Sequence, residues 1–235
     1  TDMKVKELTA WLENKYPAKA AEHWDNVGLL VGDDEAEVSH VFLALDLTEE
    51  TLEEIRQLSR LPKAVAIGEI GLDYYWHKEE HEHEIQKKMF LAQMEIAREE
   101  KLPFMVHSRD AAKDTLDLVK DCMKGGMYGG IIHCFSYGKE MAREYLDMGL
   151  YLGIGGVVTF KNAKKLKEVV AYAPLEQLVL ETDSPYLSPE PNRGKRNSSL
   201  NLSYVAEAIA QIKGCSAEEV IAITEENAKK LLLRK

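Results

Sequence analysis

The stretch KAVAIGEIG, residues 63–71, shows the pattern that decides the fold, a short apolar run that is bounded by glycine. Five other short apolar runs alternate with helical patterns along the chain: VFLALDL (41–47), LPFMVHS (102–108), GGIIHCF (129–135), GLYLGIGG (149–156) and LVLETDS (178–184). Most of these runs are apolar on both faces, as strands buried in a parallel sheet must be. The sequence therefore predicts an α/β fold with six parallel strands and helices between them.

Helix signals support this pattern. Ser216 followed by Glu219 makes a capping box, and Thr48 is placed to cap the helix that follows it. The longest amphipathic stretch covers 84–101. Before Val41 we expect a helix near 3–15 and a short strand at GLLVG (28–32). The loop 184–199 is long and irregular, which is typical of functional loops.

Composition narrows the class of protein. The 235 residues are 45% hydrophobic and 30% charged, as in one globular α/β domain. No apolar run approaches the roughly 20 residues that cross a bilayer, and the N-terminus lacks a secretory apolar segment, so we expect a cytoplasmic protein without a membrane span. Three scattered cysteines indicate reduced thiols. The net charge of -10 argues against a broad basic surface, yet an acidic enzyme can grip phosphates through metal ions.

Four side chains fall at or near the C-terminal ends of four different predicted strands: Glu69, His107, His133 and Asp183. The C-terminal edge of a parallel barrel carries the active site, and imidazole nitrogens with carboxylate oxygens suit a divalent metal that activates water. A single histidine at a strand end is more often a structural residue. Four such residues at one edge favour a metal site.

Basic residues could bind a substrate phosphate at the same edge. Arg109 follows His107 by two positions, although it could instead form a surface salt bridge to Asp110 or Asp114. Arg193, Lys195 and Arg196 lie on the loop after the last strand, where a polyanion would enter an acidic protein. Their alternative role is that of an ordinary solvated charge run.

Aromatic residues and glycines near the strand ends allow further interpretations. Tyr74, Tyr75 and Trp76 could stack on bases, or could simply pack. The glycines of GEIGLD and GIGG lack the spacing of a phosphate-binding loop, which excludes that class of cofactor site. The pair His81 and His83 falls at a helix start and is more readily explained as solvated than as a ligand pair.

Several blocks together resemble the TatD family of metal-dependent deoxyribonucleases over about 63–235: AIGEIGLDYYW (66–76), VHSRDA (106–111), IIHCFS (131–136), GIGGVVTFKNA (153–163), LVLETDSPYL (178–187) and RGKRN (193–197). The resemblance implies a TIM-type (β/α) barrel of the amidohydrolase-like kind, here distorted or with fewer than eight regular strands. It implies that Glu69 is shared between two metal ions, that His107 and His133 are ligands, and that Asp183 is a ligand and takes a proton from water. The implied reaction is hydrolysis of DNA, as single strands or ends, with magnesium, or alternatively manganese or zinc.

One departure from the family pattern bears on activity. The family's first strand ends in a His-x-His pair, whereas the corresponding stretch here reads VFLALDLT, and Asp46 is the better-placed replacement, with His23 and His40 as further candidates. We therefore expect an impaired deoxyribonuclease. The alternative is a catalytically inactive hybrid that keeps the fold and one metal ion.

The N-terminal part resembles a different family. HWDNVGLLVGD (23–33) and VFLALDLTEETLEE (41–54) are similar to the opening of the Nif-three-like proteins, whose metal ligands are absent here. This resemblance implies a fusion or chimera, in which residues 1–62 pack as part of a barrel formed by 63–235. We expect one domain, as a monomer or homodimer.

Overall fold

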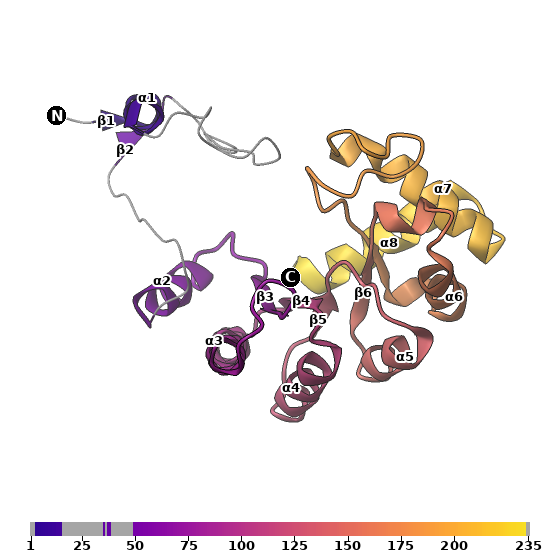
Figure 1. Ribbon diagram of the computed structural model, residues 1–235, viewed down its shortest axis with the longest axis horizontal. Coiled ribbons are helices and arrows are strands. Elements are labelled where there is room, and N and C mark those ends of the chain that lie inside the picture. The colour runs from indigo at the N-terminus through magenta and orange to yellow at the C-terminus, as the bar shows by residue number, and fades with distance from the viewer. Residues whose placement is uncertain (1–2, 16–34, 36, 39–48, 234–235) are drawn as a thin grey trace. The chain divides into compact units, whose positions relative to one another are not determined.

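The structure, a computed structural model, describes residues 3–15, 35, 37–38 and 49–233 (Figure 1). Contacts divide the chain into two units, Thr1–Asp46 and Leu47–Lys235. The predicted strands 28–32 and 41–47, the cap Thr48 and the candidate ligands His23, His40 and Asp46 lie outside the described residues. These predictions stay untested.

The first unit contains one helix and two very short strands. Helix α1 (Val5–Lys15) follows strand β1 (Met3–Lys4), which pairs antiparallel with β2 (Glu37–Val38). Glu35 accepts from the side chains of Lys4 and Lys6 at 2.8 and 2.5 Å. The helix predicted near 3–15 is thus present.

The second unit is built on a parallel sheet of five strands in the order β3-β4-β5-β6-β7. Their bounds are Ile67–Asp73, Phe104–Arg109, Gly130–Ile132, Tyr151–Ile154 and Leu178–Leu180. Five of the six predicted strands are therefore confirmed. Strands β5, β6 and β7 are shorter than the apolar runs that predicted them, because the backbone stops pairing with the neighbouring strand before each run ends.

Helices α3 to α6 connect successive strands and cover one face of the sheet, whereas α2 precedes β3, and α7 and α8 follow β7 (Figure 1). Their bounds are α2 Glu49–Ser59, α3 Glu80–Glu99, α4 Ala112–Lys124, α5 Lys139–Asp147, α6 Lys164–Tyr172, α7 Leu202–Lys213 and α8 Ala217–Leu232. Short 3-10 turns lie at η2 Gly156–Thr159, η3 Leu175–Gln177 and η4 Ser199–Asn201. This alternation is the architecture of a TIM-type barrel, with five regular strands in the described part of the chain.

Two helix predictions can be compared with the structure in detail. The hydroxyl of Ser216 accepts from the backbone N–H of Glu219 at 3.1 Å, which confirms the cap of α8. The helix predicted for 84–101 instead runs Glu80–Glu99. It begins earlier because the N–H of Glu79 donates to the Glu82 carboxylate at 3.3 Å, and it ends earlier because Lys101 adopts a left-handed conformation with φ 52°.

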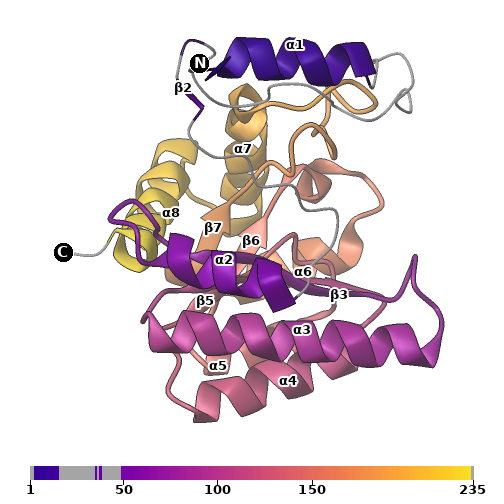
Figure 2. The ribbon, with the colours of Figure 1, turned by 90° about the vertical axis from the view of Figure 1, so that its left-hand side faces the viewer.

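Helix α2 lies beside α3 (Figure 2). Arg56 of α2 forms an ion pair with Glu99, and Arg60 pairs with Glu100 at 2.9 Å.

No helix among the described residues combines the length and apolar character that a bilayer crossing requires. Cys122, Cys134 and Cys215 are all free thiols, as predicted.

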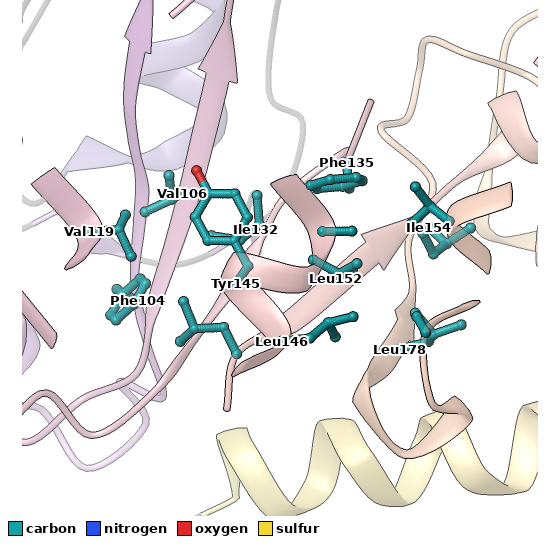
Figure 3. Close-up of a cluster of buried hydrophobic side chains, with 14 of the residues drawn as sticks. Phe104, Val106, Val119, Ile132, Phe135, Tyr145, Leu146, Leu152, Ile154 and Leu178 are labelled. Carbon is teal, nitrogen blue, oxygen red and sulfur yellow. The ribbon is translucent and has the colours of Figure 1, made fainter. Parts of the chain in front are cut away.

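Side chains alternate between the two faces of the sheet, as strand geometry requires. One set packs against the helices in the main core, which includes Phe104, Val106, Ile132, Leu152, Ile154 and Leu178 from the strands, with Val119, Tyr145 and Leu146 from the helices (Figure 3). The other set faces away from those helices, on what we call the inner face. Its buried members Ile131, Tyr151 and Val179 pack with Leu231 of α8, and half-buried Met105 joins them.

Candidate metal centre

The inner face changes character toward the C-terminal ends of the strands. Two positions after Met105 and Ile131, on the same face, stand His107 and His133. His107 lies within β4, and His133 is the first residue after β5, held by its backbone N–H donating to the carbonyl of Val106 at 2.8 Å. The sequence thus places both imidazoles at one edge because parallel strands end together.

Glu69 of β3 joins the two histidines. Its Oε1 lies 2.8 Å from Nδ1 of His107 and 3.5 Å from Nδ1 of His133. The ligating atoms of all three residues lie within 4.8 Å of one another. Gly71 permits this approach, because a Cβ there would stand 2.7 Å from the Cβ of His107.

The charges of this group are coupled. The hydrogen bond from His107 lowers the pKa of Glu69, and the same bond raises the pKa of His107. The carboxylate therefore stabilises positive charge at this point, whether as a proton on the imidazole or as a cation between the three residues. Within the described residues the buried Nδ1 of His133 has no hydrogen-bond partner, so this atom is available to bind a cation.

Asp183 lies beside this group and not within it. Its Oδ1 is 3.8 Å from Nε2 of His133, and its backbone is left-handed with φ 54°. The structure thus brings together three of the four residues predicted as ligands, and places the fourth against His133. Since all four are oxygen or nitrogen donors at one edge, the residues present fit a divalent cation.

Sequence reasoning missed Glu181. Its side chain is 13% exposed, and its Oε2 lies 3.8 Å from Nε2 of His133. Burial raises its pKa, and Oε1 has no partner among the residues described. Gly153 makes room for it, since a Cβ there would fall 2.0 Å from Oε2. The alternation from Val179 to Glu181 and Asp183 was the signal that could have found it.

Asp73, at the end of β3, is a second residue that sequence reasoning missed. Its Oδ2 lies 3.7 Å from Nε2 of His107, while its Oδ1 accepts from the backbone N–H groups of Tyr75 and Trp76 at 2.9 and 3.3 Å. A cavity of about 320 Å³ opens beside it, lined by Glu69, Gly71, Asp73, His77, Gln86 and His107. This cavity gives a small ligand access to Glu69 and His107.

Comparison with known proteins agrees with this geometry. The family model described as TatD related DNase matches residues 13–233. The chain belongs to this family. It is 49% identical over 193 residues to the uncharacterized metal-dependent hydrolase YabD of Bacillus subtilis, an alignment that covers 82% of this chain and 74% of YabD.

Two further comparisons concern a TatD exonuclease and a solved structure. The chain is 35% identical to the 3'-5' ssDNA/RNA exonuclease TatD of a Rahnella species, over 75% of this chain and 68% of that one. The crystal structure of YJJV, a TatD homologue from Escherichia coli K12, superposes with a TM-score of 0.73 at 27% identity, over 80% of this chain and 72% of that one. The chain is thus a TatD-family metal-dependent hydrolase with the family's barrel-like fold.

In this TatD-family chain, Arg109 does not form the salt bridge considered as its alternative role. Asp114 pairs instead with Lys87 and with the hydroxyl of Tyr74, both at 2.8 Å. The guanidinium of Arg109 lies over the ring of Tyr75, 4.1 Å from its centroid. Arg109 is therefore exposed at the C-terminal end of β4, two residues after His107, with its charge available to an anion.

The basic loop after β7 is also exposed. Arg193 lies over the ring of Phe160 at 4.3 Å, and Lys195 and Arg196 point to solvent. Buried Asn197 anchors the loop, because its amide donates to the carbonyls of Thr182 and Tyr186, close to Asp183 in the chain. The loop that carries the three basic residues is thus anchored to the segment that contains Asp183.

The His81 and His83 pair belongs to the first turn of α3. The ring of His83 stacks on Tyr74 with 3.6 Å between centroids, and its Nε2 lies 2.8 Å from the carbonyl of His77. Neither histidine belongs to the potential metal group found among the described residues. Both histidines thus stand at a helix start, as predicted, but His83 is half-buried against Tyr74 and is not solvated.

Proposed function

We propose that this TatD-family hydrolase cleaves phosphodiester bonds of DNA, as single strands or ends, with a divalent cation. The observation that carries the proposal is the convergence of Glu69, His107 and His133 on one point beside Asp183, with exposed Arg109 at the end of the strand that carries His107. A relative named as a 3'-5' ssDNA/RNA exonuclease supports the choice of substrate. Magnesium is the preferred cation, with manganese or zinc as alternatives.

The cation would be held by Glu69, His107, His133 and Asp183. When bound, it supplies Lewis acidity that activates water and neutralises charge on phosphate oxygens. A site with two carboxylates and two imidazoles suits several divalent ions, which is why the residues do not select one.

The other residues act on substrate and proton. Asp183, at the margin of the group, accepts the proton of the attacking water on a carboxylate oxygen. Arg109 binds the phosphate through its planar guanidinium, which matches two phosphate oxygens. Arg193, Lys195 and Arg196 attract the polyanion toward the acidic edge of the protein.

Other predictions remain open. They are the origin of residues 1–62 in the Nif-three-like family, their packing in one domain with 63–235, the loss of activity that the missing His-x-His pair implies, the monomeric or dimeric state and the cytoplasmic location. The family model begins at residue 13, so the TatD resemblance extends well beyond Lys63 toward the N-terminus.

The test is hydrolysis of single-stranded DNA by the purified protein with added magnesium or manganese. Asp183→Ala is compared with Asp117→Ala, which removes an exposed carboxylate of α4 that pairs with Lys113. We expect metal-dependent cleavage that is lost in Asp183→Ala and kept in Asp117→Ala. Absence of cleavage by well-folded protein with either metal would overturn the proposal and favour the inactive alternative.

A further inference from the structure

The connection between β3 and α3 projects beyond the C-terminal end of the sheet (Figure 2). It carries three successive aromatic residues with different environments. Tyr74 packs, since its ring stacks on His83 and its hydroxyl donates to Asp114. Tyr75 and Trp76 are 44% and 70% exposed, so packing within this unit does not account for them.

Arg109 connects the exposed aromatic pair to the site. Its guanidinium lies 4.1 Å from the ring centroid of Tyr75 and 5.7 Å from that of Trp76. The two rings meet edge to face, with centroids 4.7 Å apart and an interplanar angle of 89°. One cation and two rings thus form a continuous surface, which we call the aromatic platform.

Hydrogen bonds hold the backbone of the platform. Asp73 accepts from the N–H groups of Tyr75 and Trp76, and the N–H of Tyr74 donates to the carbonyl of Arg109 at 2.9 Å. Gln86 of α3 accepts from the N–H of Asp73 at 2.8 Å and donates to its carbonyl at 3.2 Å. A surface ordered in advance loses little conformational entropy when a ligand stacks on it.

The same carboxylate fixes the platform relative to the candidate metal centre. The second oxygen of Asp73 lies 3.7 Å from Nε2 of His107, and both residues line the cavity beside Glu69. A phosphate held at the centre would therefore place an attached nucleoside within reach of the platform. The positive charge of Arg109 favours a ligand that combines a flat ring with a phosphate.

We propose that Trp76, Tyr75 and Arg109 form a subsite for one unpaired nucleobase of a single-stranded nucleic acid, next to the scissile phosphate. This rests on the proposed phosphodiesterase function. The base stacks on the indole of Trp76, while Arg109, positioned by Tyr75, faces the adjoining phosphate. Since every base presents a flat face, the subsite selects unpaired bases over paired ones without reading their identity.

The test separates base recognition from catalysis. Two substrates are used, a single-stranded oligothymidylate and an oligomer of equal length made of abasic deoxyribose phosphates. Trp76→Ala is compared with Trp76→Phe, which keeps a stacking ring, and with Tyr172→Ala. Tyr172 is a matched control, because it lies at the end of α6, is 41% exposed beneath Lys139 of α5 and lines no part of the site.

On oligothymidylate we expect Trp76→Ala to raise KM about tenfold with kcat changed less than about twofold, which is the effect of losing one stacked base. Trp76→Phe should restore most of the affinity, and Tyr172→Ala should match the wild type. On the abasic oligomer, wild type and Trp76→Ala should have equal KM. An unchanged KM on oligothymidylate, or an equal loss on both substrates, would overturn the subsite while leaving the proposed function in place.

Binding without turnover distinguishes the remaining outcomes. Oligothymidylate is titrated in the presence of Ca²⁺, and quenching of tryptophan fluorescence is followed in wild type and in Trp76→Phe. Quenching that weakens in Trp76→Phe from a protein that cleaves no DNA would retain the subsite and reject the proposed function. If the wild type shows neither quenching nor cleavage, both are rejected.

Discussion

The two ends of the inner face contrast sharply in chemistry although the same strands form both. At the N-terminal end, buried Ile131, Tyr151 and Val179 pack against Leu231 of α8. At the C-terminal end, His133 stands two residues after Ile131, and Glu181 stands two residues after Val179. Both carry buried polar atoms that have no partner among the described residues. One end thus satisfies its side chains by packing, and the other holds polar groups that a cation or water would satisfy.

This difference teaches where stability and chemistry reside. Apolar packing at the N-terminal end lowers the free energy of the fold, whereas unpartnered polar atoms at the C-terminal end raise it. Substitutions at the apolar end should therefore lower stability with little effect on activity. Substitutions at the polar end should lower activity with little effect on stability. The predictions below use that contrast, in order of decreasing effect.

Glu69→Ala should lower metal-dependent kcat/KM by more than about 100-fold, because removal of a ligand exceeds the loss of a supporting contact. The free energy of unfolding of the metal-free protein should change by less than about 1 kcal/mol, since the side chain is 47% exposed. Activity assays and urea denaturation measure the two quantities. A large loss of stability would remove the contrast between the two ends.

Leu231→Ala should destabilise the protein by about 2 kcal/mol, at the lower end for a buried leucine because it lies near the end of α8. The kcat/KM should stay within about twofold of the wild type. Leu233→Ala is the matched control, as Leu233 is 60% exposed and should have little effect. Equal destabilisation by the two variants would show that α8 does not seal the inner face.

Asn227→Ala should destabilise by about 1.5 kcal/mol, because it leaves buried carbonyls unsatisfied. The amide of Asn227 donates to the carbonyls of Leu175 and Leu178 at 2.9 and 2.8 Å, which fastens α8 to the start of β7. Thermal and urea unfolding measure the loss. Gln211→Ala, an exposed amide on α7, provides the comparison and should be neutral.

Asp114→Asn should have the smallest effect and should depend on pH. Lys87 first, and then the hydroxyl of Tyr74, lower the pKa of Asp114. A depressed folded-state pKa adds stability above the unfolded value of about 3.9, and this stability is lost as pH falls through the folded pKa. The pair is partly exposed, so the difference from wild type should stay below about 1 kcal/mol.

Urea denaturation at pH 7 and at pH 3 measures this difference. Asp114→Asn should be less stable than wild type at pH 7, and the difference should be smaller at pH 3. The same network raises the pKa of Tyr74 to about 12, through burial and its bond to Asp114. A difference that grows toward acid would contradict the assigned direction.

Much of the fold was accessible from local pattern. Five apolar runs predicted five parallel strands, because strands buried on both faces need apolar residues at every position. The ends of helices were harder to predict from the sequence. The helix at 84–101 shifted to Glu80–Glu99 since its limits depend on the cap at Glu79 and the left-handed Lys101, which contribute little to periodicity.

The candidate site, like the fold, could be predicted from the sequence only in part. Glu69, His107 and His133 could be grouped from sequence because each stands at or next to the end of an apolar run, and parallel strands bring such ends to one edge. Glu181 was missed because its carboxylate is buried only through the space left by Gly153 on the neighbouring strand. Arg109 could be placed near the site but its partner could not be predicted, since its contact with Tyr75 joins the end of β4 to the connection between β3 and α3.

The sequence by itself determined the class of fold, the edge at which chemistry gathers and three residues that converge there, because strand periodicity and parallel order follow from local pattern. Only the tertiary structure decided that Asp183 stands beside the group and not within it, that Glu181 is buried, and that Asp73 ties an exposed aromatic platform to His107. Those facts depend on distances between different strands, which no single stretch of sequence encodes.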